Sequence, residues 1–402
     1  MNLDHSIFKL KGVIQHYSWG GYNFIPQLLG INNAEKKPFA EYWMGAHGNY
    51  PASIDNHGKE IPLNDFIRTN LDGILGSEVS KKYSSLPYLL KVLDVRQMLS
   101  IQVHPSKQAA ELAFEEENKK NIPVNAPHRN YKDANHKPES MVALSDFWLL
   151  HGFKKKEDLE NILDKETEFF FLKDVFFTSG YKGLYERVML MDQSGVNQVL
   201  AALVQKIIPL YNNGSLPKTS EDFWAARAAL NFCRDGNYDR GIFSIYLFNL
   251  VHLKKGEGVF QPAGLPHAYL EGQNVEIMAN SDNVLRSGLT DKYIDVGELL
   301  KHVKFEATIP KILNPQSHHK IFLSTAEEYE LQQYLLENGD EQKIETTTGE
   351  IFLLLEGSLQ VISDDQKVEI RKGDSIFVKA GCKLQVMPLS NINLFRATVP
   401  PQ

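Results

Sequence analysis

The stretch GEGVFQPAGLPH, residues 256–267, constrains the fold of this chain more than any other part of its sequence. Gly256 is followed after five residues by Pro262, then after one residue by Gly264 and after two more by His267. Glycine and proline together make a sharp corner between two β-strands, because they favour turn conformations. The first inward position after such a corner points into the interior of a small barrel. The spacing therefore predicts a corner between two strands with the imidazole of His267 pointing inward, although an ordinary core histidine after a turn has the same local pattern.

A second copy of this corner occurs near the end of the chain. In KGDSIFVKAGCKL, residues 372–384, Gly373 and Gly381 repeat the spacing of the two glycines above. Lys379 and Leu384 stand where the first copy has proline and histidine. We therefore expect a second barrel that keeps the corner but has lost the polar side chain.

The patterns between these corners divide the chain into four ranges. The stretch LPYLLKVLDVRQMLSIQVHP, residues 86–105, predicts buried strands, and SKQAAELAFEEENKK, residues 106–120, predicts a helix capped by Ser106. Apolar residues at helical spacing fill KKKEDLENILDK, SEDFWAARAALNF and the long run from Leu184, and strands are expected to resume at Ile242. The prediction is a mainly β chain with an α-helical insertion: a first barrel from 1–152 and 241–310, a helical domain at 153–240, and a second barrel at 311–402.

Composition narrows the classes of function. The chain has 402 residues, a formal net charge of -7 and two cysteines, Cys233 and Cys382, outside any CxxC pair. A net acidic surface opposes general nucleic-acid binding, and the separated cysteines indicate neither a disulfide framework nor a thiolate zinc site. No apolar run is long enough for a membrane span or a leader peptide. We expect a cytoplasmic monomer with no nucleic-acid or membrane partner.

Three further polar residues are candidates to join His267 at a metal. In SIQVHP, Gln102 and His104 share one face of a strand and are costly to bury unless something binds them. NHKPESMVAL offers Glu139 at the start of another strand, whereas Glu111 lies in the predicted helix and is expected to be solvated. This mixed oxygen and nitrogen set suits Zn²⁺ with one open position, and ligand type alone also permits Mn²⁺ or Fe²⁺.

Five blocks of sequence together resemble a known family. QHYSWGG, AEYWMGAH, LSIQVHPSK, YKDANHKPES and GLPHAYLEGQNVEIMANSDNVLRSGLT, in this order between residues 15 and 290, are similar to the type I mannose-6-phosphate isomerases of the cupin superfamily. The resemblance implies one zinc held by Gln102, His104, Glu139 and His267. It also implies two cupin (jelly-roll) barrels with a helical domain inserted in the first, and a place in mannose metabolism and GDP-mannose biosynthesis.

The implied reaction interconverts mannose 6-phosphate and fructose 6-phosphate through a cis-enediol. Lys137, His136 and Glu276 are candidates for the proton-transfer base, because each lies close in sequence to a metal-ligand candidate. Lys137 could instead face solvent, and Glu276 could instead pair with Arg286. Arg286 is expected to bind the phosphate or the enediolate oxygens. Weaker candidates for the phosphorylated hexose complete the set: Lys292, Ser100 and Lys107 for the phosphate, and Trp19 for the sugar.

Two other functions fit parts of the same pattern. Two histidines and a carboxylate are the facial triad of Fe(II) oxygenases, so a cupin dioxygenase is one alternative. A non-catalytic sugar-binding or regulatory cupin is another, and loss of ligands would be its mark. Gln102 as a fourth ligand and the cations Lys137 and Arg286 favour the isomerase over both.

Overall fold

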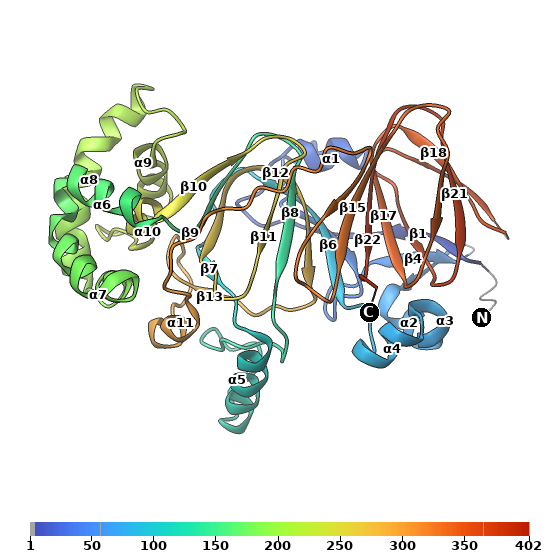
Figure 1. The fold of residues 1–402 in the computed structure, drawn as a ribbon, viewed down its shortest axis with the longest axis horizontal. Coiled ribbons are helices and arrows are strands. Elements are labelled where there is room, and N and C mark those ends of the chain that lie inside the picture. Colours follow the sequence, from blue (N-terminus) through green and yellow to red (C-terminus); the bar gives the residue numbers. More distant parts are fainter. Residues whose placement is uncertain (1–4, 57, 365, 402) are drawn as a thin grey trace.

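The computed structural model describes residues 5–56, 58–364 and 366–401. Three regions follow one another along the long axis of the molecule: a group of helices, a first β-barrel in the centre, and a second β-barrel that contains the C-terminus (Figure 1). The predicted fold class, mainly β with a helical part and two barrels, is confirmed.

The first barrel is built from a ten-stranded sheet that curves around β12 (His267–Ala279). This long strand pairs with β6 and β8 in its second half, with β9 in its first half, and with β7 at His267. Apolar side chains such as Met141, Phe147 and Val259 fill part of its interior. The strands of this sheet besides β12 are β2 (Val13–Gln15), β3 (Glu41–Gly45), β6 (Tyr88–Val95), β7 (Gln102–Val103), β8 (Glu139–Ala143), β9 (Phe147–Phe153), β10 (Phe248–Leu253), β11 (Gly258–Gln261) and β13 (Leu285–Arg286).

The second barrel packs an eight-stranded sheet against a four-stranded sheet around its own apolar core. The larger sheet has the order β14-β15-β22-β17-β20-β1-β4-β5, and the smaller has the order β16-β21-β18-β19. The strands are β1 (Ile7–Lys11), β4 (Ser53–Asn56), β5 (Lys59–Pro62), β14 (His319–Phe322), β15 (Glu330–Leu336), β16 (Gln342–Glu345), β17 (Glu350–Glu356), β18 (Ser358–Ile362), β19 (Lys367–Arg371), β20 (Ser375–Val378), β21 (Lys383–Pro388) and β22 (Ile392–Thr398).

Three N-terminal strands, β1, β4 and β5, lie in the range predicted for the first barrel but belong to the sheet of the second barrel. β1 pairs with β20 and β4, so strands from within residues 1–152 complete the sheet of the second barrel. Alternation in a short strand shows which face is apolar but carries no information on the partner strand. The face between the barrels is apolar as well, since Val275 and Ile277 of β12 and Leu353 and Phe395 belong to one buried cluster. The two barrels therefore share a hydrophobic interface.

The helical region follows β9 and ends just before β10. Its members are α6 (Lys156–Lys165), the 3₁₀ turn η1 (Thr167–Phe169), α7 (Phe170–Met189), α8 (Gln193–Asn212), α9 (Glu221–Phe232) and α10 (Gly241–Leu247). The expectation of strands from Ile242 was wrong for this last helix, whose seven residues are all buried. A short run that is apolar on every side has no period that separates helix from strand.

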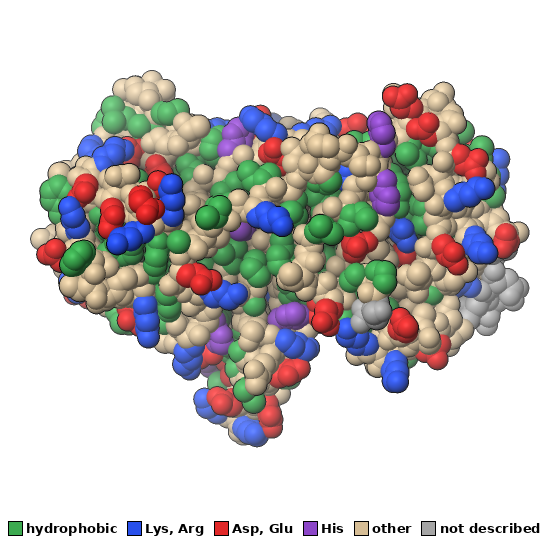
Figure 2. Space-filling view, in the orientation of Figure 1, with side chains coloured by type: hydrophobic (Ala, Val, Ile, Leu, Met, Phe, Trp, Pro, Cys, Tyr) green, Lys and Arg blue, Asp and Glu red, His purple; other side chains and the backbone are tan. Residues whose placement is uncertain are grey.

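Shorter helices lie outside this region. α5 (Lys107–Lys119) projects from the first barrel in Figure 1, and its predicted cap is confirmed because the Ser106 hydroxyl accepts a hydrogen bond from the Ala109 amide. The others are α1 (Phe24–Leu28), α2 (Leu63–Thr69), α3 (Leu71–Leu75), α4 (Ser77–Tyr83) and α11 (Val296–His302). Across the described residues, every helix is too short or too polar to cross a bilayer. Acidic and basic side chains are interspersed over the face shown in Figure 2.

Candidate active site and metal centre

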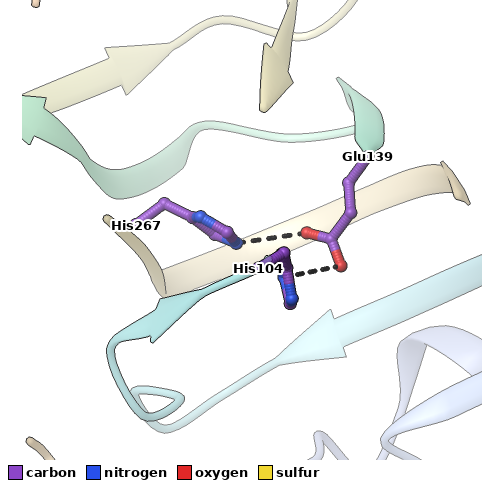
Figure 3. A group of neighbouring side chains, drawn as sticks. All are labelled: His104, Glu139 and His267. Atoms are coloured by element: carbon purple, nitrogen blue, oxygen red, sulfur yellow. Dashed lines mark hydrogen bonds and ion pairs between the residues drawn. The ribbon is translucent and has the colours of Figure 1, made fainter. Parts of the chain in front are cut away.

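Three strand ends of the first barrel bring His104, Glu139 and His267 together (Figure 3). His104 directly follows β7, Glu139 is the first residue of β8, and His267 is the first residue of β12. The corner before His267 has the backbone that its sequence predicts, because Gly256 and Gly264 have φ values of 88° and 82°. An L-residue adopts this left-handed region at a cost, so glycine suits both positions.

The three side chains form a tight, buried group. Their ligand atoms all lie within 4.8 Å of one another. His267 Nε2 is 3.2 Å from Glu139 Oε2, and His104 Nε2 is 3.4 Å from Glu139 Oε1. The exposed fractions of His104, Glu139 and His267 are 0%, 4% and 3%. Such polar groups are costly to bury without a binding partner.

The hydrogen bonds of the two imidazoles show what that partner must be. Nδ1 of His104 lies 2.8 Å from the carbonyl oxygen of Asn283, and Nδ1 of His267 lies 2.9 Å from that of Leu265. A carbonyl oxygen can only accept, so each Nδ1 carries the proton and each neutral ring turns the lone pair of Nε2 toward Glu139. Among the described residues, His104 Nε2 has no hydrogen-bond partner. Two lone pairs and a carboxylate facing one point require a cation, and this donor set fits Zn²⁺.

The titration properties of the group are those of metal ligands. Burial lowers the pKa of His104 to about 4, which keeps the ring neutral at physiological pH. Burial by itself raises the pKa of the Glu139 carboxyl, but the charge of Lys137, whose Nζ lies 3.1 Å from Oε1, holds it well below its usual range. A neutral imidazole and an ionised carboxylate are the forms that bind a metal.

Comparisons with known proteins agree with this site. Residues 7–156 match the family model described as phosphomannose isomerase type I, catalytic domain. Mannose-6-phosphate isomerase of Salmonella typhimurium strain LT2 is 33% identical over 386 residues, covering 92% of this chain and 94% of the relative. The chain therefore belongs to the type I phosphomannose isomerases.

A mammalian relative and a solved structure agree with this membership in the type I phosphomannose isomerases. The human mannose-6-phosphate isomerase is 36% identical over 330 residues, covering 76% of this chain and 74% of that protein. The crystal structure of the Salmonella typhimurium enzyme bound to fructose 6-phosphate and zinc superposes with a TM-score of 0.89 at 32% identity. That comparison covers 99% of this chain and all of the other. The fold of the whole chain, second barrel included, is thus that of the family.

Gln102 and Lys137 also face the cavity beside this isomerase's histidine and carboxylate group. A small cavity of about 50 Å³ is lined by both residues together with Glu139 and His267. Lys137 is 8% exposed, and its Nζ lies 3.1 Å from Glu139 Oε1. The alternative in which Lys137 faces solvent is therefore wrong.

His136 points away from this site, so the structure does not bring it together with the other two base candidates, Lys137 and Glu276. Its Nε2 donates to Glu328 Oε1 at 2.7 Å, and it lines a separate cavity of about 670 Å³. Neighbouring residues of an extended segment point to opposite sides, so His136 and Lys137 cannot both face the metal group. Lys107 lines that same separate cavity and donates to Asn135 Oδ1 at 2.9 Å, so it lies apart from Arg286 and Lys292, the other phosphate candidates.

Glu276 faces the same small cavity, with a partner that the sequence did not reveal. Lys91 Nζ lies 3.2 Å from Glu276 Oε1, and the Tyr269 hydroxyl donates to Glu276 Oε2 at 2.7 Å. Burial raises the pKa of Glu276, Lys91 opposes this, and Glu139 adds to it. The alternative pairing of Glu276 with Arg286 is replaced by the pair with Lys91.

Lys91 and Glu41 are the site residues that sequence reasoning missed. Lys91 is 5% exposed, and its Nζ lies 3.5 Å from Glu41 Oε2 as well as close to Glu276. Burial alone lowers the pKa of Lys91, but the two carboxylates raise it above its usual value. The available signal was a single lysine in the otherwise apolar strand core YLLKVL.

A larger cavity of about 600 Å³ adjoins the metal group and shares Gln102 with it. It is lined by four of the predicted substrate residues, namely Arg286, Lys292, Ser100 and Trp19. Burial lowers the pKa of Arg286, and burial followed by the charge of Arg286 lowers that of Lys292. The helical region adds Phe232 and Arg234 to the wall, which no sequence pattern had indicated.

Proposed function

We propose that this chain interconverts D-mannose 6-phosphate and D-fructose 6-phosphate, as its relatives are named to do, with the sugar in the cavity between Trp19 and the metal group. The observation that carries the proposal is the buried group of His104, Glu139 and His267, whose lone pairs converge beside a cavity lined by three cations, Arg234, Arg286 and Lys292. Family membership identifies the reaction class that such a site serves.

One zinc ion would be held by His104, Glu139 and His267, with the amide oxygen of Gln102 as fourth ligand. When bound, it supplies a Lewis acid that stabilises negative charge on the sugar oxygens. The backbone carbonyls that accept from each Nδ1 orient the two rings, so the ligand geometry is set before the ion arrives.

The remaining chemistry is carried by the chain's own side chains. Arg286 offers bidentate donors and Lys292 a second charge to the phosphate, which anchors the substrate while Trp19 lines the sugar. A base must take the proton from C2 and return it to C1 through the enediol. Lys137 and Glu276 line one cavity and are the two candidates, while Lys91 and Tyr269 hold Glu276 in place.

The alternative functions are not favoured. A dioxygenase has no use for the cations of the substrate cavity, and a regulatory sugar-binding cupin would have lost the ligand group that the first barrel retains. The cytoplasmic location and the monomeric state stay predictions, as does the absence of nucleic-acid and membrane partners. The two cysteines are unpaired, in keeping with a reducing compartment.

The test is a coupled assay of fructose 6-phosphate formation from mannose 6-phosphate, run before chelation, after chelation and after zinc is added back, with elemental analysis of each sample. We expect turnover to disappear with the metal and to return with zinc at one ion per chain. Turnover by demonstrably metal-free protein would overturn the metal assignment. Bound zinc without isomerase turnover would overturn the reaction, and oxygen consumption would then test the dioxygenase.

A further inference from the structure

The segment that carries Lys137 and Glu139 has two faces with different partners. Lys137 and Glu139 line the small cavity of the first barrel. His136 and Ser140, which flank them in the sequence, point the other way and contact consecutive residues of the chain that leads into β15 of the second barrel. Alternation along an extended segment produces this division.

The outward contacts are specific: the one at Ser140 is buried, and the one at His136 is partly buried. Glu328 Oε1 accepts a hydrogen bond from His136 Nε2 at 2.7 Å, and the hydroxyls of Ser140 and Tyr329 are hydrogen-bonded at 3.1 Å. Glu328, Tyr329 and Ser140 are 7%, 1% and 1% exposed. Buried hydrogen bonds of this kind restrict a side chain to one position, because an unpaired polar group there is costly. The second barrel thus contacts the outer face of the segment at two residues, His136 and Ser140, which are four positions apart.

The first barrel holds the backbone on both sides of Lys137. Glu139 pairs with Gln261 and Met278 in the sheet, and the Ala279 amide donates to the carbonyl of Pro138. Before Lys137, the carbonyl of Asn135 accepts from the side-chain amide of Asn283 at 2.8 Å. The contacts of His136 and Ser140 add the second barrel to these supports.

We propose that Glu328 and Tyr329 are positioning residues of the active site, through which the second barrel holds Lys137 and Glu139 at the zinc site of the first. This assignment rests on the proposed function for its catalytic consequence, but not for its effect on the segment itself. It gives the ligand-free barrel a part in the site, since the strand that follows Tyr329 belongs to its larger sheet.

Four single variants distinguish a loss of position of Lys137 and Glu139 from a general loss of stability. Glu328→Ala removes the acceptor for His136, Glu328→Gln keeps an acceptor oxygen there, and Tyr329→Phe removes one hydroxyl. Glu327→Ala is the matched control, because the neighbouring Glu327 is 73% exposed at its side chain and pairs with Lys82. Hydrogen exchange of peptides covering residues 135–141 in the metal-free protein, zinc affinity by chelator competition, and kcat and KM are measured for each.

We expect Glu328→Ala to increase exchange in the segment, to weaken zinc binding about 10-fold to 100-fold and to lower kcat with KM nearly unchanged. Glu328→Gln should recover most of each change, Tyr329→Phe should weaken zinc binding several-fold, and Glu327→Ala should match the parent. Ser140→Ala combined with Tyr329→Phe should be no worse than either alone, because both remove one contact.

The outcomes are decisive even if a variant is unstable or the reaction is a different one. Parental exchange and zinc affinity in both Glu328→Ala and Tyr329→Phe would overturn the proposal, as would equal losses in Glu327→Ala. If Glu328→Ala fails to fold, the test rests on Ser140→Ala, Tyr329→Phe and the variant that combines them. Losses of zinc affinity that add up in the combined variant would then refute the contact between Ser140 and Tyr329. Exchange and zinc affinity do not involve turnover, so a parent protein without isomerase activity would refute the proposed function and leave this test intact.

Discussion

The two barrels repeat one corner and use it differently. Gly256 and Gly264 of the first corner have φ values of 88° and 82°, and Gly373 and Gly381 of the second have 89° and 76°. In each copy a four-residue strand, β11 or β20, lies between the two glycines and pairs at its last residue with a buried glutamate. The repeat seen in the sequence is therefore a repeat of backbone and of strand pairing.

The paired glutamates are Glu139 and Glu350, each the first residue of its strand. Glu139 faces Nε2 of His104 and of His267, whose lone pairs would bind a cation. Glu350 instead accepts from the guanidinium of Arg396, with Nε 2.6 Å from Oε2 and Nη2 2.7 Å from Oε1. A buried carboxylate needs a counter-charge in both barrels. The second barrel supplies that charge as Arg396, whereas the first supplies Lys137, 3.1 Å from Glu139, and adds two histidine Nε2 atoms that would bind an ion.

The corner histidine is the residue whose exchange should have the largest effect. Replacing His267 with leucine gives the first corner the residue that the second carries at Leu384, which is 3% exposed in an apolar core. We expect zinc to be lost and turnover to fall on the order of a thousandfold, because several kcal/mol of charge stabilisation depend on the metal. Elemental analysis and the coupled assay measure both. The comparison fails if His267→Leu keeps its zinc.

Removing the built-in counter-charge should damage stability and leave the metal site alone. Arg396→Met leaves Glu350 buried without its partner and should lower the free energy of unfolding by about 3–5 kcal/mol. A second change, Glu350→Leu, should restore most of the loss. Arg371→Met is the control, since that exposed pair with Glu369 is worth less than about 1 kcal/mol. Urea unfolding and zinc content check these expectations, and an unchanged Arg396→Met midpoint would contradict them.

The next comparison is between one cavity in each barrel. Arg286 lines the cavity of about 600 Å³ in the first barrel, and Lys383, beside Leu384, lines a cavity of about 500 Å³ in the second. Arg286→Ala should lower kcat/KM about 100-fold for the phosphorylated substrate while zinc stays bound, because charge-assisted contacts to the phosphate are lost. Lys383→Ala should change neither. Equal kinetics for Arg286→Ala and the parent would remove Arg286 from the phosphate site.

Sequence alone predicted what depends on local pattern. The corner spacing, its second copy and the alternating face of Gln102 and His104 are properties of short segments, because turn chemistry and strand period act over a few residues. The structure accordingly brings His104, Glu139 and His267 together as expected.

What the sequence could not predict depends on partners distant in the chain. The pairing of Glu276 with Lys91 follows from the register of β12 on β6, and β1 joins a strand more than 350 residues later. The direction of His136 was open because Pro138 makes the local alternation uncertain, and Glu328 decides it. Such long-range choices are set by tertiary packing, which a single sequence does not display.

The smallest expected difference is in the stability lost when a glycine of each corner, Gly381 or Gly264, is replaced by alanine. A Cβ added at Gly381 would meet no heavy atom of the described structure within 4 Å, so Gly381→Ala should cost about 1 kcal/mol from the left-handed backbone alone. At Gly264 the added Cβ would lie 2.9 Å from the His302 carbonyl oxygen and 2.9 Å from Lys304 Cγ. Gly264→Ala should therefore cost about 1 kcal/mol more and, by shifting the chain three residues before His267, weaken zinc binding. Urea midpoints and chelator competition measure the two variants. Equal stability losses with unaltered zinc affinity would mean that the first corner tolerates movement, and that His267 is held by its strand pairing with Gln102 rather than by the turn.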